Sequence, residues 1–235
     1  MILPGLNPII KAMPALNVVK QYVIDGYYHV YNRGVEKRDI FLDQQDYSVF
    51  LRFLKEYLLP LNHPDLKTLQ GFNPRRRPKN YSDQITLLAY CLMPNHFHLF
   101  IKQKTHDGLK QFMTALGTNY VMYFNHKNDR VGPLFQGVYK AALIAEEPYY
   151  LHISRYIHRN PRSITRVQPL HTYPYSSYRY FLNEKAPDWL HPHEILSMFR
   201  SGQSIMPRDI LSYQSFVEHE AIDDEAMLGR LRLEE

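Results

Sequence analysis

The sequence predicts an α+β fold built on one antiparallel sheet. Segments rich in Tyr, Val, Leu and Ile alternate with amphipathic stretches, and two adjacent apolar segments are joined by the turn-forming pair Pro94-Asn95. No apolar run approaches the roughly 18 residues that a membrane-spanning helix needs. A chain of 235 residues with 45% hydrophobic and 22% charged residues has the composition of a globular protein with a substantial core.

The first part of the chain predicts a leader, a strand, a helix and a loop. Prolines interrupt residues 1–20, so we expect an irregular leader without a signal peptide. Residues 27–34 alternate and favour a strand. Apolar residues recur at helical spacing over 44–61, and Asp43 is a suitable N-cap. Residues 60–82 predict a loop that carries a basic run.

The order of the following elements predicts a known arrangement. We expect a hairpin of two strands, a helix, a strand and a helix, at 84–93 with 96–103, 108–127, 133–144 and 147–160. Pro148 suits the first turn of the last helix, and Pro161 ends it. The resulting order β-α-β-β-α-β, followed by α, is the ferredoxin-like split β-α-β fold with an extra helix.

The remainder predicts a small helical extension. Beyond Pro169 the chain is rich in Tyr and Pro, and short helices are expected near 193–200 and 207–220. We therefore divide the chain into three parts. These are the leader 1–20, a main domain 21–183 that contains the insert 60–82, and an extension 184–235 that ends in an acidic tail.

The net charge of +5 conceals an asymmetry. Residues 218–235 hold seven acidic and two basic side chains, which leaves 26 basic and 16 acidic residues, or a net +10, over 1–217. A basic body with 19 tyrosines is typical of a protein that contacts a polyanion and stacks on bases, although a basic protein that binds no nucleic acid has the same composition. The single cysteine, Cys91, excludes an internal disulfide and predicts a cytoplasmic location.

Two histidines stand one residue apart in the stretch "CLMPNHFHLFIKQ". Side chains at i and i+2 of a strand share a face, so His96 and His98 point the same way and Phe97 points opposite. Such a pair could bind a metal ion or a phosphate, or it could be two ordinary polar residues on a solvent-facing side.

The helix expected at 147–160 offers partners for these histidines. His152, Tyr156 and Asn160 recur every fourth residue and therefore lie along one helix face. If this helix packs over the strand face that bears the histidines, a phenol, two imidazoles and an amide converge. Such a set suits phosphoryl transfer to a tyrosine hydroxyl, with a divalent ion held by the imidazoles and the Asn160 carbonyl.

Several motifs resemble those of a known group of enzymes. The stretch "MPNHFHLFI" resembles the His-hydrophobic-His motif of the HUH single-strand nucleases and transposases. "GPLFQGVYKAALI" followed by "RYIHRNP", together with "YPYSSYRYF", resembles the REP-associated tyrosine transposases and related insertion-sequence transposases. The likeness extends from about Tyr27 to Tyr180, and the combination of motifs is more specific than His-x-His alone.

The resemblance implies a mechanism and a role for four residues. His96 and His98 match the metal-binding histidines, Tyr156 matches the nucleophile, and Asn160 matches the position that completes the metal site. Relatives use Mg²⁺ or Mn²⁺ to cleave and rejoin single-stranded DNA next to imperfect hairpins, through a 5′-phosphotyrosine intermediate and a free 3′-hydroxyl. Both monomers and homodimers occur among them, and no membrane partner is implied.

Alternatives remain at the sequence level. Tyr120 is the second candidate nucleophile, ahead of Tyr123 and Tyr139, and Asn160 could simply end its helix before Pro161. DNA phosphate contacts are expected from five basic side chains, namely Arg75, Arg76, Arg77, Lys79 and Lys140. The alternative functions are a non-catalytic protein that only binds hairpin DNA, and an RNA-binding split β-α-β protein whose sheet tyrosines stack on bases.

Overall fold

The structure is a computed structural model that describes residues 21–69, 79–164, 169–202 and 210–219. The leader and most of the acidic tail therefore lie outside the described residues, as does most of the basic run. Within the described part of the chain, no helix is long and apolar enough to cross a membrane.

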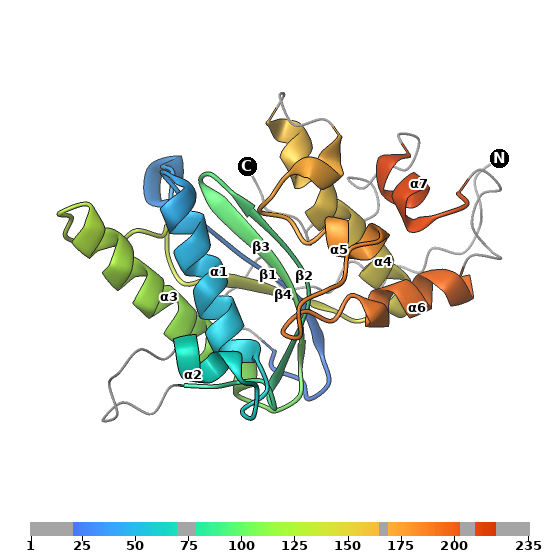
Figure 1. The fold of residues 1–235 in the computed structure, drawn as a ribbon, viewed down its shortest axis with the longest axis horizontal. Helices are drawn as coiled ribbons and strands as arrows, with labels where there is room; N and C mark the ends of the chain where they lie inside the picture. Colours follow the sequence, from blue (N-terminus) through green and yellow to red (C-terminus); the bar gives the residue numbers. More distant parts are fainter. Residues whose placement is uncertain (1–20, 70–78, 165–168, 203–209, 220–235) are drawn as a thin grey trace.

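A four-stranded sheet forms the centre of the fold (Figure 1). The strands are β1 (Tyr27–Arg33), β2 (Ile85–Met93), β3 (His96–Gln103) and β4 (Lys140–Ile144). Their spatial order is β2-β3-β1-β4, and every neighbouring pair is antiparallel. This order confirms the predicted split β-α-β arrangement.

Helices cover both faces of this sheet. On one face lie the two helices that connect non-adjacent strands, and on the other lies the helix after the last strand (Figure 1). They are α1 (Gln44–Leu58) and α3 (Gly108–Lys127) on the first face, and α4 (Glu147–Arg159) on the second. Phe97 and Leu99 of β3 pack toward α1 and α3, whereas Phe100 packs toward α4. The alternation along β3 thus places His96 and His98 on the face that α4 covers.

Helix α1 begins where the sequence predicts and ends earlier. The Asp43 side chain accepts hydrogen bonds from Gln45 N at 2.9 Å and Asp46 N at 3.1 Å, which stabilises the helix by about 1 kcal/mol. The helix stops at Leu58 instead of continuing to 61, because a proline at position 60 disfavours helical geometry at Leu59, which is extended. The loop predicted at 60–82 also contains a short helix, α2 (Asp65–Leu69).

The strand predicted over 133–144 is regular only from Lys140. Before that point the chain follows β1 through single contacts, which include the isolated bridge between Gly34 and Phe135. The Asn32 side chain donates from Nδ2 to the Gly137 carbonyl at 3.0 Å, so a side chain takes the place of a main-chain ladder bond. The sequence pattern did not indicate this substitution.

The C-terminal elements pack against α4 instead of standing apart. They comprise α5 (Arg179–Leu182), α6 (His193–Gly202) and α7 (Tyr213–Glu218). The structure also contains 3₁₀ turns at Val35–Lys37, Asn160–Ser163 and Leu170–Thr172. Helix α6 confirms the prediction at 193–200, whereas α7 is shorter than 207–220 because its N-cap is Ser212.

Two buried side chains of α4 attach this extension. His158 Nδ1 lies 2.9 Å from the Tyr213 hydroxyl, and its Nε2 lies 2.9 Å from Ser177 Oγ. Arg155 donates from Nε to the Phe216 carbonyl at 2.6 Å. The helix that carries Tyr156 is therefore fixed on its outer side by α7 and on its inner side by the sheet.

Candidate active site

The site is built on cross-strand rows of the sheet face below α4. In one row Arg33 of β1 pairs with His96 of β3. In the next row Lys140 of β4 pairs with Tyr31, and Tyr31 pairs with His98. Residues that pair directly share a sheet face, so two cations flank the two histidines.

The ring orientation of His96 is determined by Asn95. The Asn95 amide donates from Nδ2 to the Lys37 carbonyl at 3.2 Å, which leaves Asn95 Oδ1 facing the imidazole. His96 Nδ1 lies 2.6 Å from this oxygen and must donate to it, because a carbonyl oxygen only accepts. A neutral imidazole carries one N–H, so His96 Nε2 keeps a bare lone pair.

The Asn160 side chain faces this lone pair with its oxygen. Asn160 Nδ2 donates to the Tyr156 carbonyl one turn earlier at 2.9 Å, so the remaining Oδ1 points to His96 Nε2 at 3.4 Å. Two acceptor atoms therefore face each other without a hydrogen atom between them. A cation placed among them removes this repulsion.

The ring of His98 lies beside that of His96, with centroids 4.9 Å apart. Its Nδ1 lies 2.9 Å from His29 Nε2 of β1, and the two rings stack with centroids 5.1 Å apart. Its Nε2 is buried and has no hydrogen-bond partner among the described residues. Buried polar nitrogens are rarely left in this state, and a metal ligand is one of the explanations for such an atom.

Both imidazoles are held in the neutral form that binds metals. Burial, aided by Arg33 and opposed by Asn160, lowers the pKa of His96 to about 4. Burial also moves the pKa of His98 well below its usual range, with contributions from His96 and His29. A neutral imidazole offers its lone pair at physiological pH.

The donor set fits a divalent cation. Two imidazole nitrogens and one amide oxygen converge, and this ligand set suits Mn²⁺. As a complete coordination shell it suits Mg²⁺ poorly, but it suits a Mg²⁺ ion that also keeps water and substrate oxygens as ligands. Within the described ranges no group of three His, Cys, Asp or Glu side chains is arranged to hold a metal ion, and the third candidate ligand here is an amide. His96, His98 and Asn160 are thus brought together as the sequence predicts.

Tyr156 lies directly over this set. Its ring meets His98 edge to face at a centroid distance of 5.4 Å, and meets His29 in the same way at 5.6 Å. The side chain is half-buried, so it remains accessible to a substrate. The side chain of His152, from the same helix, instead packs on Phe216 of α7.

Tyr120 occupies a different environment. It is fully buried on α3, across the sheet from the histidines, and its hydroxyl donates to the Ile40 carbonyl. Burial raises its pKa far above the usual range, which disfavours a phenolate nucleophile. This placement favours Tyr156 over Tyr120.

The predicted DNA-binding residues divide into two groups. Lys140 lies on β4 with its ammonium 5.9 Å from the centre of the Tyr31 ring, on the face of the site. Lys79 is exposed. Arg75, Arg76 and Arg77 lie outside the described residues.

Three residues of the site were not predicted from the sequence. His29, Arg33 and Asn95 are brought to the histidines by strand pairing and by the turn before β3. The alternation of 27–34 already placed His29, Tyr31 and Arg33 on one strand face. The sequence did not show whether this face of β1 would lie on the same side of the sheet as His96 and His98 of β3.

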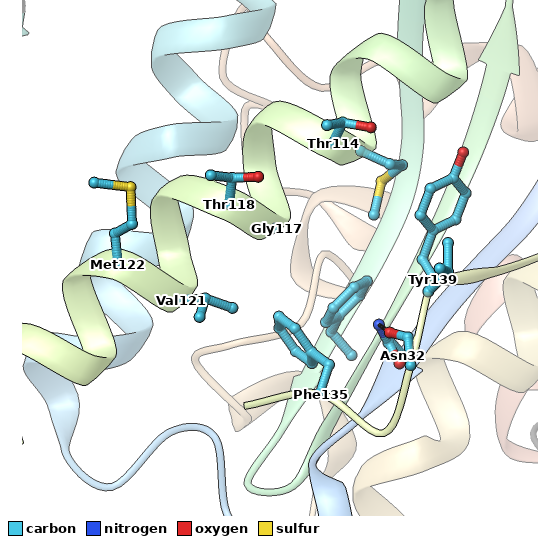
Figure 2. Close-up of a pocket in the computed structure, with 12 residues that line it drawn as sticks. Asn32, Thr114, Gly117, Thr118, Val121, Met122, Phe135 and Tyr139 are labelled. Carbon is cyan, nitrogen blue, oxygen red and sulfur yellow. Dashed lines mark hydrogen bonds between the residues drawn. The ribbon is translucent and has the colours of Figure 1, made fainter. Parts of the chain in front are cut away.

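A separate hollow lies on the opposite side of the sheet, between α3 and the segment before β4. Figure 2 shows Asn32, Phe135 and Tyr139 across from Thr118 and Val121 of α3. Among the described residues that line it, Tyr139 is the one titratable group, and its hydroxyl lies 2.9 Å from that of Tyr22. This lining offers no chemistry comparable to the face below α4.

Comparison with known sequences identifies a family for the central segment. Residues 77–160 match the model of the family described as "Transposase IS200 like". The matched segment is about a third of the chain and contains His96, His98, Tyr156 and Asn160. It confirms, for this segment, the resemblance to insertion-sequence transposases that the motifs indicated. No curated protein sequence matches the chain.

A solved structure is also similar to the chain. It is described as "Structure of the REP associates tyrosine transposase bound to a REP hairpin", and it shares 15% sequence identity with this protein. The alignment covers 74% of this chain and 89% of that chain, with a TM-score of 0.49.

Proposed function

We propose that this protein is a metal-dependent tyrosine transposase or nuclease that cleaves and rejoins single-stranded DNA next to hairpins. The observation behind the proposal is that His96 Nε2 and Asn160 Oδ1 face each other at 3.4 Å beside the ring of His98, which the Tyr156 ring meets edge to face. The family match of the segment that contains all four residues supports the same conclusion.

The residues divide the reaction between them. The Tyr156 oxygen attacks the phosphorus and loses its proton to solvent, while the bond from phosphorus to the 3′ oxygen breaks and that oxygen gains a proton. The products are a 5′-phosphotyrosine and a free 3′-hydroxyl, and the reverse attack by a 3′-hydroxyl rejoins a strand. His96, His98 and Asn160 would hold Mg²⁺ or Mn²⁺, which supplies polarisation of the scissile phosphate.

The test is incubation with a labelled hairpin oligonucleotide that carries single-stranded flanks. We expect a covalent protein–DNA species that forms with Mn²⁺ and not with EDTA. A protein that binds the hairpin tightly without any cleavage would instead be the non-catalytic hairpin-binding protein.

Replacement of His29 is expected to weaken metal binding. His29 Nε2 lies 2.9 Å from His98 Nδ1, and a metal-ligating His98 Nε2 requires that Nδ1 donate to this nitrogen. We expect His29→Phe to raise the Kd for Mn²⁺ by about 10- to 100-fold, measured by titration calorimetry on DNA-free protein. The exposed His126→Gln on α3 is the matched control. Equal Mn²⁺ affinity in His29→Phe and wild type would contradict this role.

The basic run is expected to contact phosphates outside the site. Simultaneous replacement of Arg75, Arg76 and Arg77 by Ala should weaken hairpin binding and reduce the slope of log K against log salt by up to about 2, at about 0.7 per lost contact. Arg52→Ala on α1, where the arginine pairs with Glu56 at 3.5 Å, is the control. An unchanged slope in the triple variant would show that the run does not contact DNA.

A further inference from the structure

We propose that Arg33 binds the scissile phosphate and stabilises the charge that develops on it during cleavage. This inference rests on the proposed function, since it assigns a partner to a side chain of the same site. It adds a phosphate-binding catalytic residue that the motifs did not indicate.

The position of Arg33 is determined by the sheet. It is the last residue of β1, and its Cα pairs directly with His96 of β3. The alternation of β1 places it on the same face as His29 and Tyr31, below α4. The backbone is held at this point by Asn32 Oδ1, which accepts from Arg33 N at 3.0 Å, and by Gln136 N, which donates to the Arg33 carbonyl at 2.9 Å.

The guanidinium has no counter-charge in the part of the chain that the structure describes. It forms no ion pair there, and its Nε is buried without a hydrogen-bond partner. Arginine is almost never fully buried unless it is paired, because burial of an unpaired charge is costly. The unpartnered Nε of Arg33, in the strand position that pairs with His96, is therefore available to a ligand of the site.

The charges around Arg33 indicate the kind of ligand. Arg33 pairs directly with His96 across β1 and β3 and shares its sheet face, so its positive charge lies beside the place where the metal would bind. Two cations at one place repel each other unless an anion lies between them. A phosphodiester presents two oxygens to such a pair, and the planar fork of arginine binds phosphate oxygens in a bidentate manner.

Replacement of Arg33 is expected to slow cleavage strongly and, in the absence of DNA, to strengthen metal binding. Arg33→Gln should slow single-turnover cleavage by about 10²-fold, the usual cost of removing one preorganised donor to a developing negative charge. The same variant should bind Mn²⁺ more tightly than wild type in the absence of DNA, because a neighbouring cation is gone. Arg33→Lys keeps the positive charge but not the planar guanidinium, so its cleavage rate and Mn²⁺ affinity should lie between those of wild type and Arg33→Gln. Thermal melting checks that the variants fold.

The decisive experiment is a double-mutant cycle that measures the binding free energy between Arg33 and one phosphate of the DNA. Hairpin strands with a normal or a neutral methylphosphonate linkage at the mapped cleavage position are titrated in EDTA, with proteins that all carry Tyr156→Phe. Arg33→Gln should lose about tenfold in affinity for the normal strand. For the methylphosphonate strand, Arg33→Gln and the parent protein should have the same affinity. Arg52→Gln should have the affinity of the parent protein for both strands.

Additive losses from Arg33→Gln and the methylphosphonate would overturn the inference, because independent contacts add. Cleavage by Arg33→Gln at the wild-type rate would overturn it as well. A wild-type protein that cleaves no hairpin strand in Mn²⁺ would instead contradict the proposed function, and the inference with it.

Discussion

Tyr156→Phe is expected to abolish strand cleavage and adduct formation while hairpin affinity stays within about twofold of wild type. The substitution removes one oxygen atom and keeps the ring that packs edge to face on His98 and His29. Loss of a nucleophile costs a rate factor on the order of 10⁶ in enzymes where it has been measured by substitution. The measurement is single-turnover cleavage together with a titration of hairpin binding.

Tyr120→Phe is the matched control for this prediction. Its hydroxyl donates to the buried Ile40 carbonyl on the other face of the sheet, so the variant should lose about 1–2 kcal/mol of stability. Its cleavage rate per folded molecule should equal that of wild type. Cleavage retained by Tyr156→Phe and lost by Tyr120→Phe would reverse the assignment of the nucleophile.

His98→Ala is expected to remove metal binding and metal-dependent cleavage together. The substitution deletes the buried, unpartnered Nε2 and leaves Asn160 Oδ1 and His96 Nε2 as the remaining ligands. We expect Mn²⁺ binding to fall below detection by calorimetry, and cleavage to fall at least about 10²-fold, as expected when a ligand and not merely a supporting residue is lost.

The exposed His106→Ala is the control for this histidine, because it lies outside the site in the turn after β3. Wild-type cleavage that continues in EDTA would contradict the metal assignment. Unchanged Mn²⁺ affinity in His98→Ala would move the metal to other ligands.

The structure also bears on the RNA-binding alternative. That reading requires tyrosines on an open sheet face to stack on bases. Tyr28 and Tyr31, on opposite faces of β1, are each 1% exposed, because α1 and α3 cover one face and α4 covers the other. Stacking of bases on these two rings would require the covering helices to move away.

Local patterns were sufficient to predict most of the fold. Alternation predicted β1, two apolar segments joined by Pro94-Asn95 predicted the hairpin of β2 and β3, and helical spacing behind Asp43 predicted α1. The spacing of Tyr156 and Asn160 predicted that both face the histidines, and in the structure the Tyr156 ring meets His98 while Asn160 Oδ1 lies 3.4 Å from His96 Nε2. These features depend on contacts within a few residues, and such contacts leave a periodic signal in the sequence.

The missed features depend on pairing between distant segments. His29 reaches His98 across 69 residues of sequence, and Arg33 reaches His96 only through the register of β1 and β3. Asn32 replaces a ladder bond of the segment before β4, which shortens the strand predicted at 133–144. The role of Asn95 depends on the Lys37 carbonyl, which lies in another part of the chain. Register is specified by the whole sheet, so one strand pattern does not reveal it.

The most direct test is a denaturing gel of the protein incubated with Mn²⁺ and a hairpin strand labelled at its 5′ or 3′ end. The account predicts a covalent adduct that retains the 3′ label, releases the 5′-labelled fragment with a free 3′-hydroxyl, and is absent with Tyr156→Phe. A strand that is bound but never joined to the protein would contradict it, and the protein would then act on hairpins by binding alone.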